Sequence, residues 1–272
     1  MSLDNVTVLL FVPGNRPERF EKAAASGADA VIVDLEDAVP ASAKNEARSA
    51  LRADFAKIPV LVRVNGEDTP WHAEDIAAVS ELPLAAIVVP KAELGGGLAD
   101  LAARRSLPVV PLIETARGLS EARQIAALPG VSRLMFGSID FCADLGCAHT
   151  REALLAARFE LVMASRLAGL PSPIDGVTTS IDDVDLIASD ARHALELGFG
   201  GKLAIHPRQI DAIRMGFRPS DFEIDWANKV LASGDGARAV DGAMVDEPVR
   251  IRARAILDRL RGSATGAGGS DG

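Results

Sequence analysis

The chain has 272 residues, 48% of them hydrophobic, and this length allows one or two domains around a substantial core. The net charge of −9 and the pI near 5.0 argue against a nucleic-acid-binding surface, so an anionic substrate would need a local cationic pocket. Cys142 and Cys147 form neither a disulfide framework nor a complete zinc site, and neither a signal peptide nor a membrane-spanning run is recognisable. We therefore expect a cytoplasmic protein that binds neither nucleic acid nor membrane.

Eight short apolar runs are each followed by a helical pattern. Strands are expected at residues 6–12, 30–37, 59–66, 85–91, 109–114, 133–140, 172–177 and 201–207. Helices are expected from about Pro17, at 42–55, at 71–81, after Gly97, after Gly118, and at 151–168, 181–198 and 209–215. This alternation predicts an α/β protein with a parallel sheet, and eight units predict a (β/α)8 TIM barrel. A doubly wound open sheet is the alternative, but no Gly-x-Gly-x-x-Gly follows the first strand.

A different pattern follows the barrel. Helices are expected at residues 221–233 and 249–260, with loops at 234–237 and 242–248, and these two helices have apolar faces but no core of their own. We expect a barrel catalytic domain at 1–215, a C-terminal helical lid and oligomerisation segment at 216–261, and a disordered tail at 262–272. The lid segment must bury its apolar faces on a partner surface, which predicts a homo-oligomer.

Charged and polar residues gather at the carboxyl ends of the predicted strands. They are Glu36, Arg63, Lys91, Glu114, Asp140, Asp175 and His206. Barrel enzymes carry their chemistry on this face, so the placement indicates an active site there.

Glu114 and Asp140 end two successive predicted strands and would lie side by side on the rim. Two oxygen ligands with room for water and substrate suit Mg²⁺. Each acid alone is equally compatible with capping the following helix. The pair therefore predicts a magnesium site. Glu36 is expected to interact with the metal indirectly, through a bound water or through one of the metal ligands.

Arg63 is suited to bind a substrate carboxylate through its forked guanidinium, or to form a salt bridge with Glu36 or Asp37. The two readings are compatible if substrate displaces the internal partner. Arg16, on the first helix with Arg19 and Lys22, is either part of a solvated face or the residue that meets a phosphorylated cofactor tail.

Lys91 invites a Schiff-base mechanism, but nearby acids would keep it protonated, and we expect an ion pair with Glu114 or Glu93. His206 precedes Pro207 and is expected to be a hydrogen-bonded structural imidazole. Ser138 has no adjacent base in the sequence, so a serine triad is not predicted.

Several motifs occur together in one order. They are LFVPGNRPE (10–18), DLEDAV (34–39), VRVN (62–65), VPK (89–91), IETA (113–116), DGV (175–177), AIHPRQ (204–209) and G-x-M-x-D-x-P (242–248). This set resembles the citrate lyase beta-subunit-like proteins of the HpcH/HpaI aldolase superfamily over nearly the whole chain. One departure is Ile139, where relatives commonly have Glu before the ligand Asp.

The resemblance implies a Mg²⁺ enzyme that breaks or forms a C–C bond beside a thioester. It implies that Glu114 and Asp140 bind the metal, that Arg63 binds the substrate carboxylate, and that Asp246 acts as acid or base. It also implies that Asp246 reaches the active site of a neighbouring subunit, in a trimer or a multiple of one.

Three functions are compatible with these residues. The first is a lyase acting on a CoA thioester such as malyl-, citramalyl- or citryl-CoA, with a keto acid as the other partner. The second is a malyl-CoA-type thioesterase that uses the same site. The third is a beta subunit that works within a citrate lyase complex and needs an acyl-carrier partner.

Overall fold

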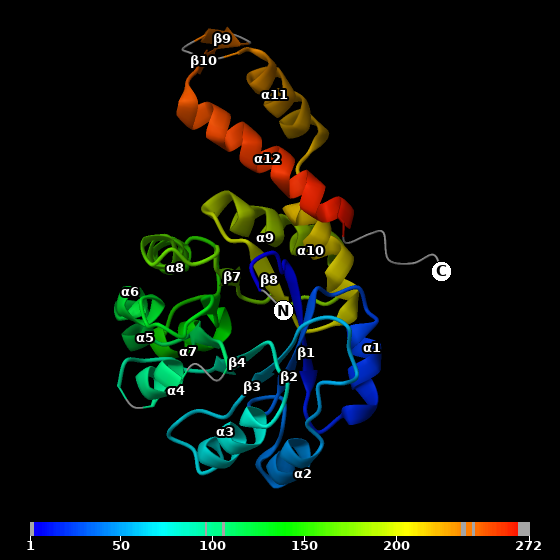
Figure 1. Ribbon diagram of the computed structural model, residues 1–272, viewed down its shortest axis with the longest axis vertical. Helices are drawn as coiled ribbons and strands as arrows, with labels where there is room; N and C mark the ends of the chain where they lie inside the picture. The colour runs from blue at the N-terminus through cyan, green and yellow to red at the C-terminus, as the bar shows by residue number, and fades with distance from the viewer. Residues whose placement is uncertain (1–2, 96, 105–106, 235–237, 241–242, 266–272) are drawn as a thin grey trace. The chain divides into compact units, whose positions relative to one another are not determined.

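A computed structural model describes residues 3–95, 97–104, 107–234, 238–240 and 243–265 of the chain (Figure 1). The chain divides into two compact units, Met1–Gly216 and Phe217–Gly272. Among the described residues, no helix combines the length and the apolar character needed to cross a membrane.

The first unit is a closed barrel of eight parallel strands, which confirms the predicted (β/α)8 architecture (Figure 1). Each strand pairs with the next along the chain, and β8 pairs with β1 through the register Leu9↔Leu203. The strands are β1 Val8–Pro13, β2 Ala30–Asp34, β3 Val60–Arg63, β4 Ala86–Val89, β5 Val109–Ile113, β6 Met135–Phe136, β7 Ile174–Asp175 and β8 Gly201–Ala204.

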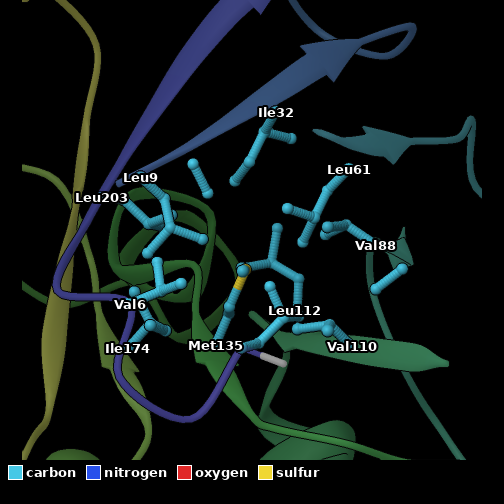
Figure 2. Packing of buried hydrophobic residues seen from close by; sticks show 13 residues of the cluster. Val6, Leu9, Ile32, Leu61, Val88, Val110, Leu112, Met135, Ile174 and Leu203 are labelled. Atoms are coloured by element: carbon cyan, nitrogen blue, oxygen red, sulfur yellow. The ribbon is translucent and has the colours of Figure 1, made fainter. Parts of the chain in front are cut away.

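Alternate residues of these strands fill the barrel interior. Figure 2 shows Leu9, Ile32, Leu61 and Leu203 among the side chains that point toward one another there. Their neighbours along the strands are buried as well, as in β2, where all five residues are buried. Burial on both sides explains why the strands read as continuous apolar runs rather than alternating ones.

Helices and short 3-10 turns follow the strands. They are η1 Pro17–Arg19, α1 Phe20–Ala24, η2 Ala41–Ala43, α2 Lys44–Ser49, α3 His72–Ser80, α4 Leu98–Arg104, α5 Ala116–Ser120, α6 Ala122–Ala126, α7 Ser138–Leu145, α8 Leu155–Leu167, α9 Val184–Leu197, η3 Pro207–Gln209 and α10 Ile210–Phe217.

Several expected boundaries in the barrel are wrong. Among the strands, β2 ends at Asp34 rather than at 37, β7 covers only Ile174–Asp175 of the expected 172–177, and β8 ends at Ala204 rather than at 207. The helix expected at 42–55 ends at Ser49, and Phe55 beyond it packs against Phe20 of α1 with tilted rings whose centroids are 5.1 Å apart. The strand expected at 133–140 is confined to β6, and α7 begins at Ser138. Asp140 therefore lies in the first turn of a helix rather than at the end of a strand.

The second unit contains two helices and a hairpin: α11 Asp221–Ala232, β9 Arg238–Val240, β10 Ala243–Val245 and α12 Glu247–Thr265. The loop expected at 242–248 thus contains a strand, which pairs antiparallel with β9. The unit also has a small core of its own, contrary to expectation, in which Val230, Val245 and Ile256 are buried.

The expected boundaries after Gly234 are only partly within the described residues. Residues 235–237 of the expected loop and 266–272 of the expected disordered tail lie outside them. Residues 262–265, also assigned to the tail, belong to α12.

Asp175, one of the strand-end acids, forms a buried charge cluster between β7, β8 and α8. Its Oδ1 accepts a hydrogen bond from Arg158 Nε at 2.8 Å, and its Oδ2 accepts one from Lys202 Nζ at 3.0 Å. Because neighbouring Ile174 points into the barrel core, Asp175 faces the helix layer. Its role here is to hold α8 against the barrel.

We predict that Asp175→Ala lowers the free energy of unfolding by about 3–5 kcal/mol, because it leaves two buried cations without their partner. Asp182→Ala is the matched control, since the Asp182–Arg208 pair is exposed and should contribute less than about 1 kcal/mol. Urea unfolding of both variants checks this. Equal losses in the two variants would contradict it.

Candidate active site

The carboxyl ends of β2 to β5 and the start of α7 bring five of the predicted residues to one rim. Glu36 follows β2, Arg63 ends β3, Lys91 follows β4 and Glu114 follows β5. Asp140 joins them from the first turn of α7. The prediction that the charged residues of these strands meet on one face is therefore correct for this set.

Arg63 is held mainly by Asp34, a partner that the sequence analysis did not assign. Its Nε and Nη2 donate to Asp34 Oδ1 and Oδ2 at 2.8 and 2.7 Å, forming a buried two-pronged pair. Its Nη1 lies 3.0 Å from Glu36 Oε2 and 3.2 Å from Asp37 Oδ2. The expected ion pairs with Glu36 and Asp37 thus exist, but they involve only the third nitrogen of the guanidinium.

The register of strands β2 and β3 could have predicted the contact between Asp34 and Arg63. Asp34 and Arg63 are direct partners in the β2–β3 ladder. Residues paired in register on neighbouring strands point to the same side, so a register prediction would have found this contact.

Lys91 connects two of the acids. Its ammonium donates to Glu36 Oε1 at 2.6 Å, and its backbone N–H donates to Glu114 Oε1 at 2.8 Å. The prediction that the Lys91 ammonium pairs with Glu114 or Glu93 is therefore wrong, because its partner is Glu36. Lys91 has a φ of +46°, a left-handed conformation that is unfavourable for a residue with a Cβ.

The charge environment disfavours nucleophilic chemistry at Lys91. Burial lowers the pKa of this amine, but the hydrogen bond and the charge of Glu36 outweigh burial and raise it overall. A protonated ammonium cannot attack a carbonyl. The absence of a Schiff base at Lys91 stays a prediction, and this environment supports it.

Glu114 is buried at the rim, with only 1% of its surface exposed. Burial, together with the negative charges of Glu36 and Asp140, raises its pKa to about 8. Gly137 lies directly against its carboxylate, and a Cβ at that position would fall 2.2 Å from Glu114 Oε2. A glycine is thus required there to make room for the acid.

The residues fit a bound magnesium ion. Burial, followed by repulsion from Glu36 and Asp140, raises the pKa of Glu114, and a divalent cation bound by Glu114 and Asp140 would stabilise its ionised form. Carboxylate oxygens are the ligands that Mg²⁺ prefers. Within the described part of the chain, no group of three or more His, Cys, Asp or Glu residues could hold a metal ion by itself.

A hydrogen bond between Ser138 and His149 corrects another expectation. His149 Nε2 lies 2.9 Å from Ser138 Oγ, so Ser138 does have a neighbouring base, eleven residues later in the sequence. Ser138 is itself buried, and its Oγ is packed against Gly176. His206 matches the expected structural imidazole, because its Nδ1 accepts from the backbone N–H of Arg208.

Arg16 and Asp246 are the two remaining predicted residues, and each has its own local partner. Arg16 is about half exposed and pairs with Glu18 at 2.6 Å. Asp246 belongs to the second unit, where its Oδ1 accepts from the backbone N–H of Val249 at the start of α12.

A cavity of about 350 Å³ opens beside the acids. Glu36 and Lys91 line one part of it, and Lys44, Asn65 and Trp71 line another. Space of this size next to the rim can accept part of a small-molecule substrate.

Comparisons with known proteins show which family this chain resembles. A family model described as HpcH/HpaI aldolase/citrate lyase matches residues 7–207. A citrate lyase subunit beta-like protein of Mycobacterium tuberculosis is 40% identical over 94% of this chain and 96% of the relative. A (3S)-malyl-CoA thioesterase of Cereibacter sphaeroides is 34% identical over 94% of this chain and 95% of the relative.

A solved structure extends the similarity to three dimensions. CitE of M. tuberculosis, in complex with magnesium, acetoacetate and coenzyme A, matches with a TM-score of 0.87 and 37% identity. The match covers 95% of this chain and the whole of that one.

The raised pKa of Glu114 predicts how stability depends on pH. Its folded-state value of about 8 exceeds its usual 4.5, so the stabilisation due to its protonated form is complete below pH 4.5 and is lost as pH rises through 8. Without metal, unfolding measurements should show wild type losing stability relative to Glu114→Gln over this interval. A pH-independent difference between the two proteins would contradict the assignment.

Proposed function

Because this chain belongs to the HpcH/HpaI aldolase/citrate lyase family, we propose that it is a Mg²⁺-dependent carbon–carbon lyase acting on a short β-hydroxyacyl-CoA thioester. Malyl-, citramalyl- and citryl-CoA are the substrates of this class that we favour. The observation that carries the proposal is the buried Glu114 carboxylate beside Asp140, Glu36 and Arg63 at the barrel rim.

Glu114 and Asp140 would hold the metal in this proposal. When bound, Mg²⁺ polarises substrate oxygens and stabilises the negative charge that develops on them. Gly137 leaves the Glu114 carboxylate space on the side of α7, and the Lys91 N–H orients its other oxygen.

Arg63 binds the substrate carboxylate in this proposal. Its Nη1 is the nitrogen that pairs with Asp37, whose side chain is 57% exposed and can give way. The Asp34 fork on the other two nitrogens keeps the guanidinium in place during this exchange. This two-pronged pair fixes the orientation of the guanidinium, so that Nη1 meets the substrate carboxylate in a defined direction.

Cleavage then requires two proton transfers. The β-hydroxyl gives up its proton, the C–C bond breaks to form the keto acid, and its electron pair passes to the α-carbon of the thioester. Glu36 suits the first transfer, because burial raises its pKa toward the working pH. Asp246 delivers a proton to the α-carbon, which leaves acyl-CoA; condensation runs the same steps backward.

In this proposal, one residue outside the rim binds the CoA moiety and another comes from a neighbouring subunit. Arg16 meets a phosphate of CoA after leaving Glu18, which is as exposed as Arg16 itself. The segment after residue 216 covers the barrel mouth of a neighbouring copy and supplies Asp246 there. The assembly is a homo-oligomer, a trimer or a multiple of one.

Thioester hydrolysis is the second candidate, favoured by the similarity to the (3S)-malyl-CoA thioesterase. The same acids would activate water at the thioester carbonyl, releasing a hydroxy acid and free CoA. A third candidate is the beta subunit of a citrate lyase complex, since a Leuconostoc mesenteroides protein of that name is 32% identical over 92% of this chain.

We predict Mg²⁺-dependent turnover when purified protein is incubated with a panel of hydroxyacyl-CoA thioesters. A keto acid plus acyl-CoA identifies the lyase, and a hydroxy acid plus CoA identifies the thioesterase.

Glu114→Gln and Asp140→Asn should each lose at least about 100-fold in kcat/KM, because each loses a metal ligand. Asp185→Asn, at an exposed position on α9, is the control. Undiminished activity in EDTA would contradict the metal mechanism, and turnover only with an acyl-carrier protein would favour the complex.

We predict that two inactive variants restore activity when they assemble together. In mixed oligomers of Asp246→Ala and Glu114→Gln, about a quarter of the sites should combine an intact metal site with an intact Asp246 from the neighbour. Mixing Glu114→Gln with Asp140→Asn is the control, because no barrel then has both metal ligands. No recovery in verified mixed oligomers, or a fully active monomer, would contradict the shared site.

A further inference from the structure

Lys44, the first residue of α2, has a buried ammonium whose three protons all have acceptors. Its Nζ donates to the backbone carbonyls of Leu35 and Glu36 at 2.7 and 2.8 Å, and to Asn65 Oδ1 at 2.6 Å. The indole of Trp71 lies over the same nitrogen, 5.2 Å from ring centroid to Nζ. The nearest hydrogen-bond acceptors are thus neutral groups of the chain, and none is a carboxylate.

These acceptors belong to two different segments of the rim. Leu35 and Glu36 follow β2, whereas Asn65 follows β3. Asn65 is held in turn by Asp75 of α3, which accepts from both its side-chain and its backbone nitrogen at 2.6 and 3.0 Å. Lys44 therefore links the turn that contains Glu36 to Asn65, the residue after β3 that Asp75 holds in place.

The cost of burying an ammonium indicates that this arrangement serves a purpose. Burial opposes the charged form and lowers the pKa of Lys44, although Asp34 and Glu36 counteract this. An apolar side chain would fill the space without that penalty but could not fix the Glu36 backbone. The carboxylate of that same residue contacts Lys91 at 2.6 Å and lies 3.0 Å from Arg63.

We propose that Lys44 is a positioning residue for Glu36: its ammonium holds the turn after β2 against Asn65 so that the Glu36 carboxylate faces Lys91 and Glu114. The inference rests on the proposed function, in which Glu36 moves a proton and adds negative charge beside the metal ligand Glu114. Lys44 itself touches no substrate in this account.

The location of Lys44 permits a direct test. Lys44 lines the 350 Å³ cavity together with Trp71 and Lys91, so a small amine can reach the space that a truncated side chain leaves. Ethylammonium carries the N–H donors of the missing group. Tetramethylammonium has the same charge without any donor and serves as the matched control.

The experiment compares Lys44→Ala in the wild-type and Glu36→Gln backgrounds. We expect kcat per folded molecule to fall at least about tenfold in the wild-type background and less than about twofold in Glu36→Gln, because coupled residues are non-additive. Ethylammonium should restore part of the loss, and tetramethylammonium should not. Lys57→Ala, at an exposed position, should leave kcat unchanged.

Mg²⁺ affinity, measured by calorimetry, provides a readout that needs no turnover. Lys44→Ala should weaken it in the wild-type background and leave it unchanged in Glu36→Gln. If wild type binds Mg²⁺ but turns over no thioester, the proposed function fails and this affinity cycle alone decides about Lys44. Lys44→Gln takes the place of Lys44→Ala if the alanine variant does not fold.

Three results would overturn the inference. The first is an equal loss in both backgrounds, which would indicate a purely structural role. The second is equal recovery with both ammonium ions. The third is an unchanged kcat and Mg²⁺ affinity in a variant whose only change is a lower melting temperature.

Discussion

The pairing of Asp34 with Arg63 is the interaction on which the rim depends. It joins the last residues of β2 and β3, and it keeps a guanidinium charged and fixed beside a group of acids. Asp34 also accepts from the backbone N–H groups of Glu36 and Ala38, so the same carboxylate shapes the turn that carries Glu36. One buried ion pair thereby fixes both the Arg63 guanidinium and the turn that carries its acidic neighbour Glu36.

The other charges of the rim are arranged around an excess of negative potential. Glu114 is buried next to Glu36 and Asp140, and two lysines stabilise this group without neutralising all of it. Repulsion of this kind destabilises the protein in the absence of a cation and favours binding of one. In the proposed metal site, some folding stability would therefore be exchanged for cation binding.

The sequence predicted the barrel and most of the rim, because apolar runs ending in charged residues are local patterns. It placed Glu36, Arg63, Lys91 and Glu114 at strand ends without any knowledge of their contacts. It predicted the pairs of Arg63 with Glu36 and Asp37, but not the Asp34–Arg63, Glu36–Lys91 and Ser138–His149 contacts, which span 29, 55 and 11 residues. The periodicity of a single strand or helix does not show which residues far apart in the sequence come into contact. The core of the second unit, which joins residues from separate elements, was missed for the same reason.

Closure of the barrel through β1 and β8 has a consequence for biosynthesis. Strand β1 pairs with β2 on one side and with β8 on the other. Its pairing with β8 must wait until residues 202–204 have left the ribosome, nearly two hundred residues after β1 itself. Until then β1 and the growing edge both present unpaired backbone groups, which attract other strands. The barrel therefore cannot close until β8 has been synthesised, and its edges stay open to wrong pairing up to that point.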